Sequence, residues 1–170
     1  MSLLIIKITA NQDSNVQQTI SLLEKHSVSH QVIDASACNI QPCTGCCACM
    51  LVTPGKCCIP DDCEAVIKSC LQYTQIVFIT DTALGFIDHK AKNLIDRMFP
   101  LVNVLTRFHN EQILHIPRYD HEFHVGLIPV GDFDQNLLEN WLDRFCNNMT
   151  AIPMGVFSIN HIQELLKCIS

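Results

Sequence analysis

A run of closely spaced cysteines is the strongest chemical signal in this sequence. Eight of the 11 cysteines lie between Cys38 and Cys63, these two included. Two residues separate each member of one triplet from the next, and seven separate the triplet from a fourth cysteine. The four are Cys43, Cys46, Cys49 and Cys57. Such spacing lets thiolates converge on one centre, as in 4Fe–4S ligation, and the same thiolates would also accept zinc.

The cysteines also bear on where the protein works. The first ten residues lack the basic start of an export signal and lead directly into a predicted strand. Disulfide frameworks are typical of small secreted proteins, and an odd number of cysteines does not suit one. We therefore expect a cytoplasmic protein whose reduced thiols are free to hold a metal or cluster. Unligated loop thiols are the alternative.

Polar side chains follow the first predicted strand. Thr9, Asn11, Ser14 and Asn15 offer hydroxyl and amide groups just before a predicted helix. Free backbone N–H groups at a helix N-terminus attract phosphate. The loop contains neither glycine nor a basic residue, so a simple capped helix, with Ser14 as the cap, is the alternative interpretation.

A second group of candidates follows the central predicted strand. The small residues and Gly85 within residues 80–86 would let backbone N–H groups approach a flat ligand closely. An ordinary connection between a strand and a helix would have a similar composition. Gly131-Asp132 gives a weaker form of the same signal after the fourth predicted strand. The histidines His109, His115, His121 and His124 lack metal-ligand spacing, and we interpret them as solvated loop residues.

Five successive strand–helix units would position these loops. Apolar runs and helical spacing predict strands at residues 3–8, 31–34, 75–80, 123–130 and 152–158, each followed by a helix. Such alternation builds a parallel sheet with helices on both faces, which binds ligands at the carboxyl ends of its strands. We predict a single α/β domain over residues 1–170, with sheet order 2-1-3-4-5 and a cysteine-rich insertion at about residues 35–60.

Three connecting regions are predicted in more detail. Residues 81–88 are predicted as a loop, and residues 109–122 as an irregular segment. Between them, apolar residues from Ala91 to Leu105 predict the buried side of one helix.

Composition excludes several classes of protein. With 48% hydrophobic and 16% charged residues, the 170-residue chain is expected to fold rather than remain disordered. A formal charge of −6 without a basic stripe argues against nucleic-acid binding. The longest apolar run, residues 3–6, is far shorter than the ~20 residues that cross a bilayer. No hydrolase motif is present, and we predict no side chain as a catalytic acid or base.

Three stretches together resemble a known family. Pro42 to Cys49, continued by Gly55-Lys56-Cys57 and Asp61-Asp62, is similar to a C-x-G-C-x-x-C…G-x-C…D-D block. Residues 76–85, followed by Lys92 to Arg97, are similar to a strand, a glycine loop and an L-K-x-x-x-D-R helix. Pro117-Arg118-Tyr119 is similar to a K-P-R-Y segment. These features resemble the flavodoxin-like NAD(P)H-dependent FMN reductases and, within them, the iron–sulfur flavoproteins.

The resemblance implies a flavodoxin-like three-layer sandwich with FMN at the carboxyl edge of the sheet. It implies that the FMN phosphate rests on the first loop, at Thr9, Asn11, Ser14, Asn15 and Val16. The isoalloxazine ring would lie against Thr80, Asp81, Thr82, Ala83, Leu84 and Gly85. In iron–sulfur members, cysteines matching Cys43, Cys46, Cys49 and Cys57 hold a 4Fe–4S cluster near the flavin, and the protein is a homodimer or homotetramer.

We therefore predict an FMN-dependent oxidoreductase or electron-transfer flavoprotein. Electrons would pass from NAD(P)H or a ferredoxin-type donor through FMN to a redox partner or small-molecule acceptor. The chain departs from the family pattern at its first loop, where Asp13 brings negative charge, and at Asp81, where the family has proline. These departures favour, as the alternative, a degenerate flavodoxin-like protein that binds a metal or a partner without flavin. A thiol redox sensor based on Cys46 and Cys49 or their neighbours is a third interpretation.

Overall fold

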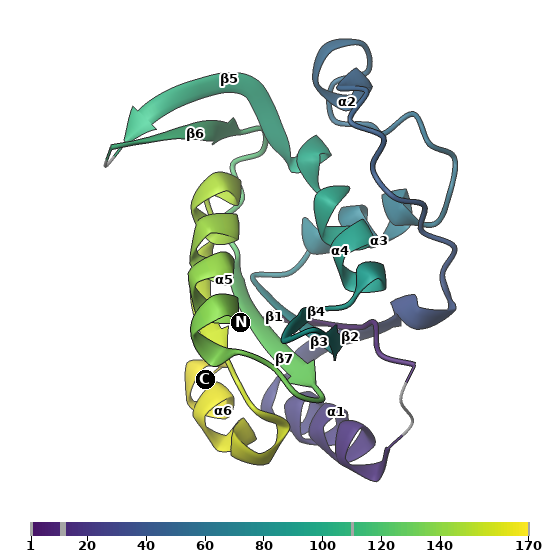
Figure 1. Ribbon diagram of the computed structural model, residues 1–170, viewed down its shortest axis with the longest axis vertical. Helices are drawn as coiled ribbons and strands as arrows, with labels where there is room; N and C mark the ends of the chain where they lie inside the picture. Colours follow the sequence, from purple (N-terminus) through teal and green to yellow (C-terminus); the bar gives the residue numbers. More distant parts are fainter. Residues whose placement is uncertain (1, 11–12, 110, 170) are drawn as a thin grey trace.

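A mostly parallel β-sheet forms the centre of the molecule (Figure 1). The computed structural model describes residues 2–10, 13–109 and 111–169. Five parallel strands follow the order β2-β1-β3-β7-β8, and a short sixth strand, β4, pairs antiparallel with β3. Their bounds are β1 (Ser2–Lys7), β2 (Ser29–Asp34), β3 (Gln75–Ala83), β4 (Phe86–Ile87), β7 (His124–Val130) and β8 (Ile152–Val156).

Helices cover both faces of this sheet. One face packs against α1 (Ser14–His26) and α6 (Ile162–Ile169). The other packs against α3 (Cys63–Cys70), α4 (His89–Asp96) and α5 (Gln135–Met149). The arrangement is the three-layer α/β architecture that the alternation of strands and helices predicts.

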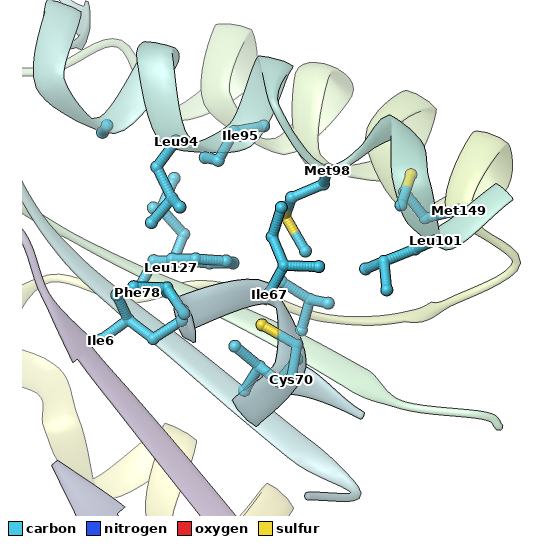
Figure 2. Close-up of a cluster of buried hydrophobic side chains, with 14 of the residues drawn as sticks. Ile6, Ile67, Cys70, Phe78, Leu94, Ile95, Met98, Leu101, Leu127 and Met149 are labelled. Atoms are coloured by element: carbon cyan, nitrogen blue, oxygen red, sulfur yellow. The ribbon is translucent and has the colours of Figure 1, made fainter. Parts of the chain in front are cut away.

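Alternating side chains of the parallel strands supply the two cores. On β1, Leu4 and Ile6 join the core under α3, α4 and α5, whereas Leu3 and Ile5 join the core under α1 and α6. Figure 2 shows the first of these cores, where α4 residues such as Leu94 lie over apolar side chains of the strands. Full burial of each such side chain contributes about 1.5–3 kcal/mol, which explains why the central strands are apolar throughout.

The predicted sheet is confirmed in class but not in detail. The sheet has six strands rather than five, and in the numbering of all strands its order is β2-β1-β3-β7-β8. The sequence predicted that the third strand ends at Thr80 and that a loop follows. Instead, β3 continues to Ala83 and the chain turns back at once to form β4. Thr80 and Thr82 favour this extension, because β-branched residues fit a strand.

A separate hairpin stands away from the central sheet (Figure 1). Its strands are β5 (Val102–His109) and β6 (Gln112–Pro117), which pair antiparallel. The predicted helical face to Leu105 and the irregular segment at residues 109–122 are therefore wrong. The helix ends at Asp96 and a short 3-10 turn, Phe99–Leu101, follows. Pro100 in that turn cannot continue an α-helix, and the valines and Thr106 beyond it favour a strand.

The cysteine-rich segment contains little regular structure. A 3-10 turn at Ala35–Ala37 opens it, and one helical turn, α2 (Ala48–Leu51), lies near its middle. Across the three described stretches of the chain, no helix combines the length and apolar character needed to span a membrane.

Candidate functional site

The loops after β1 and β3 meet at the carboxyl edge of the sheet. The Thr9 hydroxyl donates a hydrogen bond to the Asp81 carboxylate, and the Ala10 N–H donates to the other carboxylate oxygen of Asp81 at 3.1 Å. Thr9 and Thr80 are both fully buried. The structure therefore places the candidate residues Thr9, Thr80 and Asp81 at one edge of the sheet, whereas the candidate residue Asn11 lies outside the described residues.

Asp13, and not Ser14, caps the first helix. Its Oδ1 accepts hydrogen bonds from the Asn15 N–H and from the Ser14 hydroxyl, each at 3.2 Å. The Val16 N–H donates to the Asp13 carbonyl at 3.0 Å, and the Val16 side chain is buried in the core. A carboxylate at this position is stabilised by the positive end of the helix dipole. Ser14, Asn15 and Val16, which are predicted to hold phosphate, thus donate hydrogen bonds to Asp13 at the start of the helix.

In the described part of this loop, residues 9–10 and 13–16, several donors already serve the chain itself rather than a phosphate. The N–H groups of Ala10 and Asn15 point to carboxylates of the chain, and that of Thr9 donates to the Ile79 carbonyl at 3.3 Å. The nearest cation in the sequence, Lys7, is largely buried and its Nζ lies 2.8 Å from Asp34 Oδ2. Two internal carboxylates therefore occupy positions where a phosphate would need donors or positive charge.

The predicted ring-binding loop is a tight hairpin turn. Ala83 pairs with Phe86, which leaves Leu84 and Gly85 as the two central residues, with φ of 53° and 79°. Positive φ at both positions is typical of the turns that connect two-residue hairpins. The Gly85 carbonyl accepts the Asp134 N–H at 2.9 Å, which ties the turn to the start of α5. The Leu84 side chain is fully exposed at the tip.

The loop after β7 completes this edge. The Thr82 hydroxyl donates to the Val130 carbonyl at 3.3 Å. A Cβ added at Gly131, where φ is 120°, would lie 2.6 Å from the Thr82 hydroxyl oxygen. Only glycine fits such close contact in this conformation. The weaker signal of Gly131-Asp132 thus belongs to the same edge as the predicted cofactor loops.

A buried ion pair fixes the cysteine-rich segment to the sheet domain. Arg97, at the C-terminal end of α4, binds both carboxylate oxygens of Asp61 at 2.8 and 2.9 Å, and both side chains are 1% exposed. Arg97 also donates to the Gln41 carbonyl at 2.8 Å. Asp61 accepts the N–H groups of Gln41 and Cys63 as well. The two family-like motifs, D-D and D-R, therefore meet as a structural anchor.

The four predicted metal ligands lie near one another in one segment, since, after burial, negative charge on Cys57, Cys43 and Cys46 also raises the pKa of Cys49. Cys43 and Cys46 are exposed, and Cys49 and Cys57 are partly buried. The near neighbour of Cys46 is Cys58, with 3.6 Å between the two Sγ atoms. Within the described residues, no group of three or more histidine, cysteine, aspartate or glutamate side chains is placed to hold a metal ion. The structure therefore gives no support to a 4Fe–4S cluster or a zinc ion at these cysteines.

The cysteines differ in their ionisation. Burial raises the pKa of Cys63, Cys70 and Cys146 to about 12, so these thiols stay protonated and inert. By contrast, the Ala48 N–H and then the Thr44 hydroxyl stabilise the thiolate of Cys46 and lower its pKa. The hydrogen bond with Cys46 raises the pKa of Cys58. The exposed thiols therefore lie in the cysteine-rich segment, apart from Cys168 on α6.

Two hollows lie beside the hairpin, and sequence reasoning missed both. One, of about 300 Å³, lies between α2 and the hairpin, and its apolar lining includes Cys43, Phe99 and Val104. The other, of about 310 Å³, lies between the hairpin and α5, and includes Phe99 and Trp141. No periodic pattern signals these hollows, because their lining combines residues from α4's end, the hairpin and distant loops.

The histidine interpretation is wrong in part. His115 Nδ1 lies 2.9 Å from the Asn103 carbonyl, and His121 Nε2 lies 2.9 Å from the Tyr73 carbonyl. Both side chains are partly buried, whereas His109 is exposed. His109 and His115 lie in the hairpin, His121 lies between the hairpin and β7, and His124 begins β7.

Comparison with solved structures identifies the fold. No protein-family model matches this chain, and no curated protein is similar to it in sequence. RosB, solved with a bound 8-demethyl-8-formylriboflavin-5'-phosphate intermediate, is similar with a TM-score of 0.63 and 14% identity, over 93% of this chain and 64% of RosB. The chain is thus shorter than RosB, spanning less than two thirds of it.

Two further structures match over nearly their whole length. The NAD(P)H:quinone oxidoreductase from Methanothermobacter marburgensis is similar with a TM-score of 0.61 and 10% identity, over 99% of this chain and 93% of that protein. General stress protein 14 from Treponema denticola, in complex with FMN, gives a TM-score of 0.58 and 11% identity, over 100% of both chains. At these identities the likeness shows a shared fold, consistent with the predicted flavodoxin-like architecture.

Proposed function

We propose that this chain is a flavin-dependent oxidoreductase whose flavin ring lies at the carboxyl edge of the sheet. The observation that supports this most is the fold, which the chain shares over its full length with a protein solved in complex with FMN. Parallel α/β sheets bind ligands at this edge, and here the loops after β1, β3 and β7 converge on it. A bound flavin supplies the electron chemistry, while the protein supplies position and electrostatics.

The hairpin turn and its neighbours would hold the ring. The backbone of residues 80–85 would form the surface against which the ring lies. Hydrogen bonds of Thr82 with Val130 and of Gly85 with Asp134 hold this backbone in place. Leu84 would cover part of the ring with apolar surface and exclude water from it. We assign no acid or base among these side chains. NAD(P)H is the proposed electron donor and a small molecule the proposed acceptor, by analogy with the quinone oxidoreductase of the same fold.

A 4Fe–4S cluster is not needed for this function. The arguments for it are the spacing of Cys43, Cys46, Cys49 and Cys57 and the resemblance of this block to iron–sulfur flavoproteins, and the observed arrangement of these thiols gives it no support. The iron–sulfur flavoprotein assignment stays a prediction that metal analysis decides.

The proposal is tested by flavin binding and by spectroscopy. Protein purified without oxygen is examined by ultraviolet–visible absorption before and after dithionite, and iron and zinc are assayed in the same sample. Riboflavin and FMN are then each titrated into the flavin-free protein, with quenching of flavin fluorescence as the readout. We expect saturable binding of at least one flavin and its reduction by NAD(P)H. If neither flavin binds at high concentration, the proposal is wrong and the flavin-free alternative is favoured.

A dithiol–disulfide function is the second candidate, because Cys46 and Cys58 are exposed and their Sγ atoms are 3.6 Å apart. Oxidation by a hydroperoxide would break two S–H bonds and form one S–S bond. The two electrons and two protons would go to the peroxide, whose O–O bond breaks to give an alcohol and water. The fold would then serve mainly to present this pair.

Intact mass spectrometry after mild peroxide treatment tests this candidate. We expect the mass of two hydrogen atoms to be lost, and a Cys46–Cys58 peptide pair to appear on digestion. Cys58→Ser should abolish that pair. Cys47→Ser is the matched control, because Cys47 is equally exposed but its Sγ faces the Gly45 carbonyl. Unchanged mass in the wild-type protein would contradict this function.

A further inference from the structure

The hollow between the hairpin and α5 has the size and lining of a small-molecule site. Its volume is about 310 Å³, at the lower end of the ~300–1,000 Å³ that ligand pockets usually span. Phe99, from the 3-10 turn after α4, and Trp141 and Phe145, from α5, line it with aromatic rings. Trp141 and Phe145 are partly buried and Phe99 is exposed, so each ring keeps surface that a ligand can cover.

The orientations of these rings are fixed by contacts with one another and with their neighbours. Trp141 and Phe145 are stacked, with centroids 5.8 Å apart, and Phe86 packs edge-on against Trp141 at 5.3 Å. Phe99 packs edge-on against His115 at 6.0 Å. Stacked and edge-to-face contacts are the favourable arrangements of aromatic pairs. Rings held in this way offer a flat aromatic ligand a preformed surface, which reduces the entropy lost on binding.

Arg144 brings a positive charge to the same hollow. It lines the hollow and is exposed, and its guanidinium has no hydrogen-bond or ion-pair partner among the residues that the structure describes. Asp96 also lines the hollow, but its carboxylate is already bound by Lys92, one helical turn earlier on α4. A planar guanidinium can donate two parallel hydrogen bonds to a carboxylate. The lining therefore combines aromatic surface with a cation that can bind an anion.

This hollow lies at the opposite end of the sheet from the proposed flavin position. Helix α5 begins at the carboxyl edge, where the Asp134 N–H binds the Gly85 carbonyl. It ends at Met149, shortly before β8, whose first residue pairs with His124 at the start of β7. Arg144 therefore lies near the amino edge, and Figure 1 shows the hairpin beside this end of α5. A ligand in the hollow would leave the carboxyl edge open.

We infer that this hollow binds a planar aromatic carboxylate of one or two rings, independently of any flavin. The ligand's rings lie against Phe99, Trp141 and Phe145, and its carboxylate accepts hydrogen bonds from Arg144. Ring surface selects a flat aromatic body, the free guanidinium selects an anion, and the modest volume limits the number of rings. The inference goes beyond the proposed function, because it concerns a second site.

Isothermal titration with 2-naphthoate tests the inference, and its neutral counterpart 2-naphthylmethanol tests the part played by charge. We expect one 2-naphthoate to bind per chain, about tenfold more tightly than the alcohol, because a hydrogen bond to a charged group is worth at least this much. Trp141 is the one tryptophan in the sequence, so the protein has a single indole N–H resonance in its nitrogen-15 NMR spectrum. That resonance should shift as 2-naphthoate binds.

Substitutions of Arg144 separate a built site from a merely apolar surface. Arg144→Gln should weaken 2-naphthoate binding about tenfold and leave binding of the alcohol unchanged, while Arg144→Lys should restore part of the loss. Arg107→Gln is the matched control, because Arg107 is an exposed arginine on β5 that does not line the hollow. It should change neither affinity. Circular dichroism checks that each variant folds.

Four results would each overturn the inference. They are the absence of saturable 2-naphthoate binding up to millimolar concentration, as expected if a second copy of the chain covers the hollow, equal affinity for the two probes, an unmoved indole resonance, and equal weakening by Arg107→Gln. Saturating FMN should leave the affinity for 2-naphthoate unchanged, and competition between them would place the probe at the carboxyl edge and overturn the inference as well. If no flavin binds while 2-naphthoate does, the proposed function fails and the inference stands.

Discussion

Arg97 shows how much one buried charge contributes to this fold. It sits at the end of α4, 1% exposed, and both of its contacts with Asp61 are short. Removing one partner of such a pair leaves an uncompensated buried charge, which costs about 3–5 kcal/mol. We expect Arg97→Met to lower the free energy of unfolding by that amount, measured by urea denaturation.

An exposed ion pair provides the control for this substitution. Lys68 and Glu64 are one helical turn apart on α3, with a 2.7 Å contact and exposed side chains. Surface pairs of this kind contribute about 0.3–0.5 kcal/mol, so Lys68→Met should change stability little. A similar small effect of Arg97→Met would contradict the anchoring role.

The Arg97–Asp61 ion pair predicts that the protein becomes less stable in acid. Burial alone would raise the pKa of Asp61, but hydrogen bonds from Arg97, Gln41 and Cys63 outweigh it and lower that pKa below its ordinary value. An unfolded aspartate takes up a proton near pH 4, while the folded carboxylate stays charged until lower pH. The contribution of Asp61 is therefore fully present above about pH 4 and is lost as the pH falls through the folded value.

Urea denaturation between pH 3 and pH 7 measures this dependence. Asp61→Asn should be less stable at neutral pH and should lose less further stability on acidification than the wild-type protein. The comparison isolates Asp61, because both proteins share every other carboxylate. Parallel pH profiles would contradict the prediction.

At this scale, sequence reasoning located charges better than contacts. It identified Asp13 as unsuited to the phosphate loop and Asp81 as a departure within the ring-binding loop, and the structure gives both carboxylates internal partners. It noted Asp61 and Arg97 as parts of two motifs without predicting that they pair. These two side chains are 36 positions apart and meet because α4 packs on the cysteine-rich segment. The spacing of residues along the sequence does not predict that packing.

Among the elements, the turn between β3 and β4 contains an unusual residue. Leu84 is fully exposed and has a φ of 53°. The left-handed conformation costs an L-residue with a bulky side chain about 1–2 kcal/mol, whereas asparagine tolerates it. We expect Leu84→Asn to raise the free energy of unfolding by about 1 kcal/mol, because it relieves this strain.

Leu84→Ala is the matched control, since it removes the side chain but keeps a Cβ at the same φ. It should bring no comparable gain in stability. If leucine also covers the flavin ring, Leu84→Asn should weaken riboflavin binding while stabilising the fold. A loss of stability in Leu84→Asn would show that leucine makes contacts the turn needs.

The sheet was predictable because its central strands must be buried on both faces. Continuous apolar runs such as residues 76–79 have no other stable position in a chain of this length. The hairpin of β5 and β6 was not predictable, because the apolar residues from Leu101 to Leu105 fit a helix and a strand equally well. Pro100 was the local signal that the helix had ended. The turn at Leu84 lacks the Asn-Gly pair that announces a hairpin.

For the whole molecule, the homodimer or homotetramer implied by the family resemblance stays a prediction. The hairpin leaves Leu105, Phe108 and Ile113 between 61% and 75% exposed. Monomeric proteins rarely expose large apolar patches, so self-association has a physical reason. Sedimentation velocity should give a mass of two or four 19.1 kDa chains. A single species with the mass of one chain would contradict this.

The cysteine-rich segment is joined to the fold by hydrogen bonds at its base and by its one helical turn, where Met50 is buried in the core under α3, α4 and α5. Asp62 accepts the Asn39 N–H at 2.8 Å and returns its own N–H to the Asn39 carbonyl, while Asp61 accepts the Gln41 N–H at 2.8 Å. The chain between these contacts is a closed loop, and doubling the length of such a loop costs only about 0.6 kcal/mol in chain entropy. Insertions and deletions within residues 41–47, which are exposed throughout, are thus nearly neutral for the scaffold, which leaves the thiol chemistry there free to diverge while the sheet stays the same.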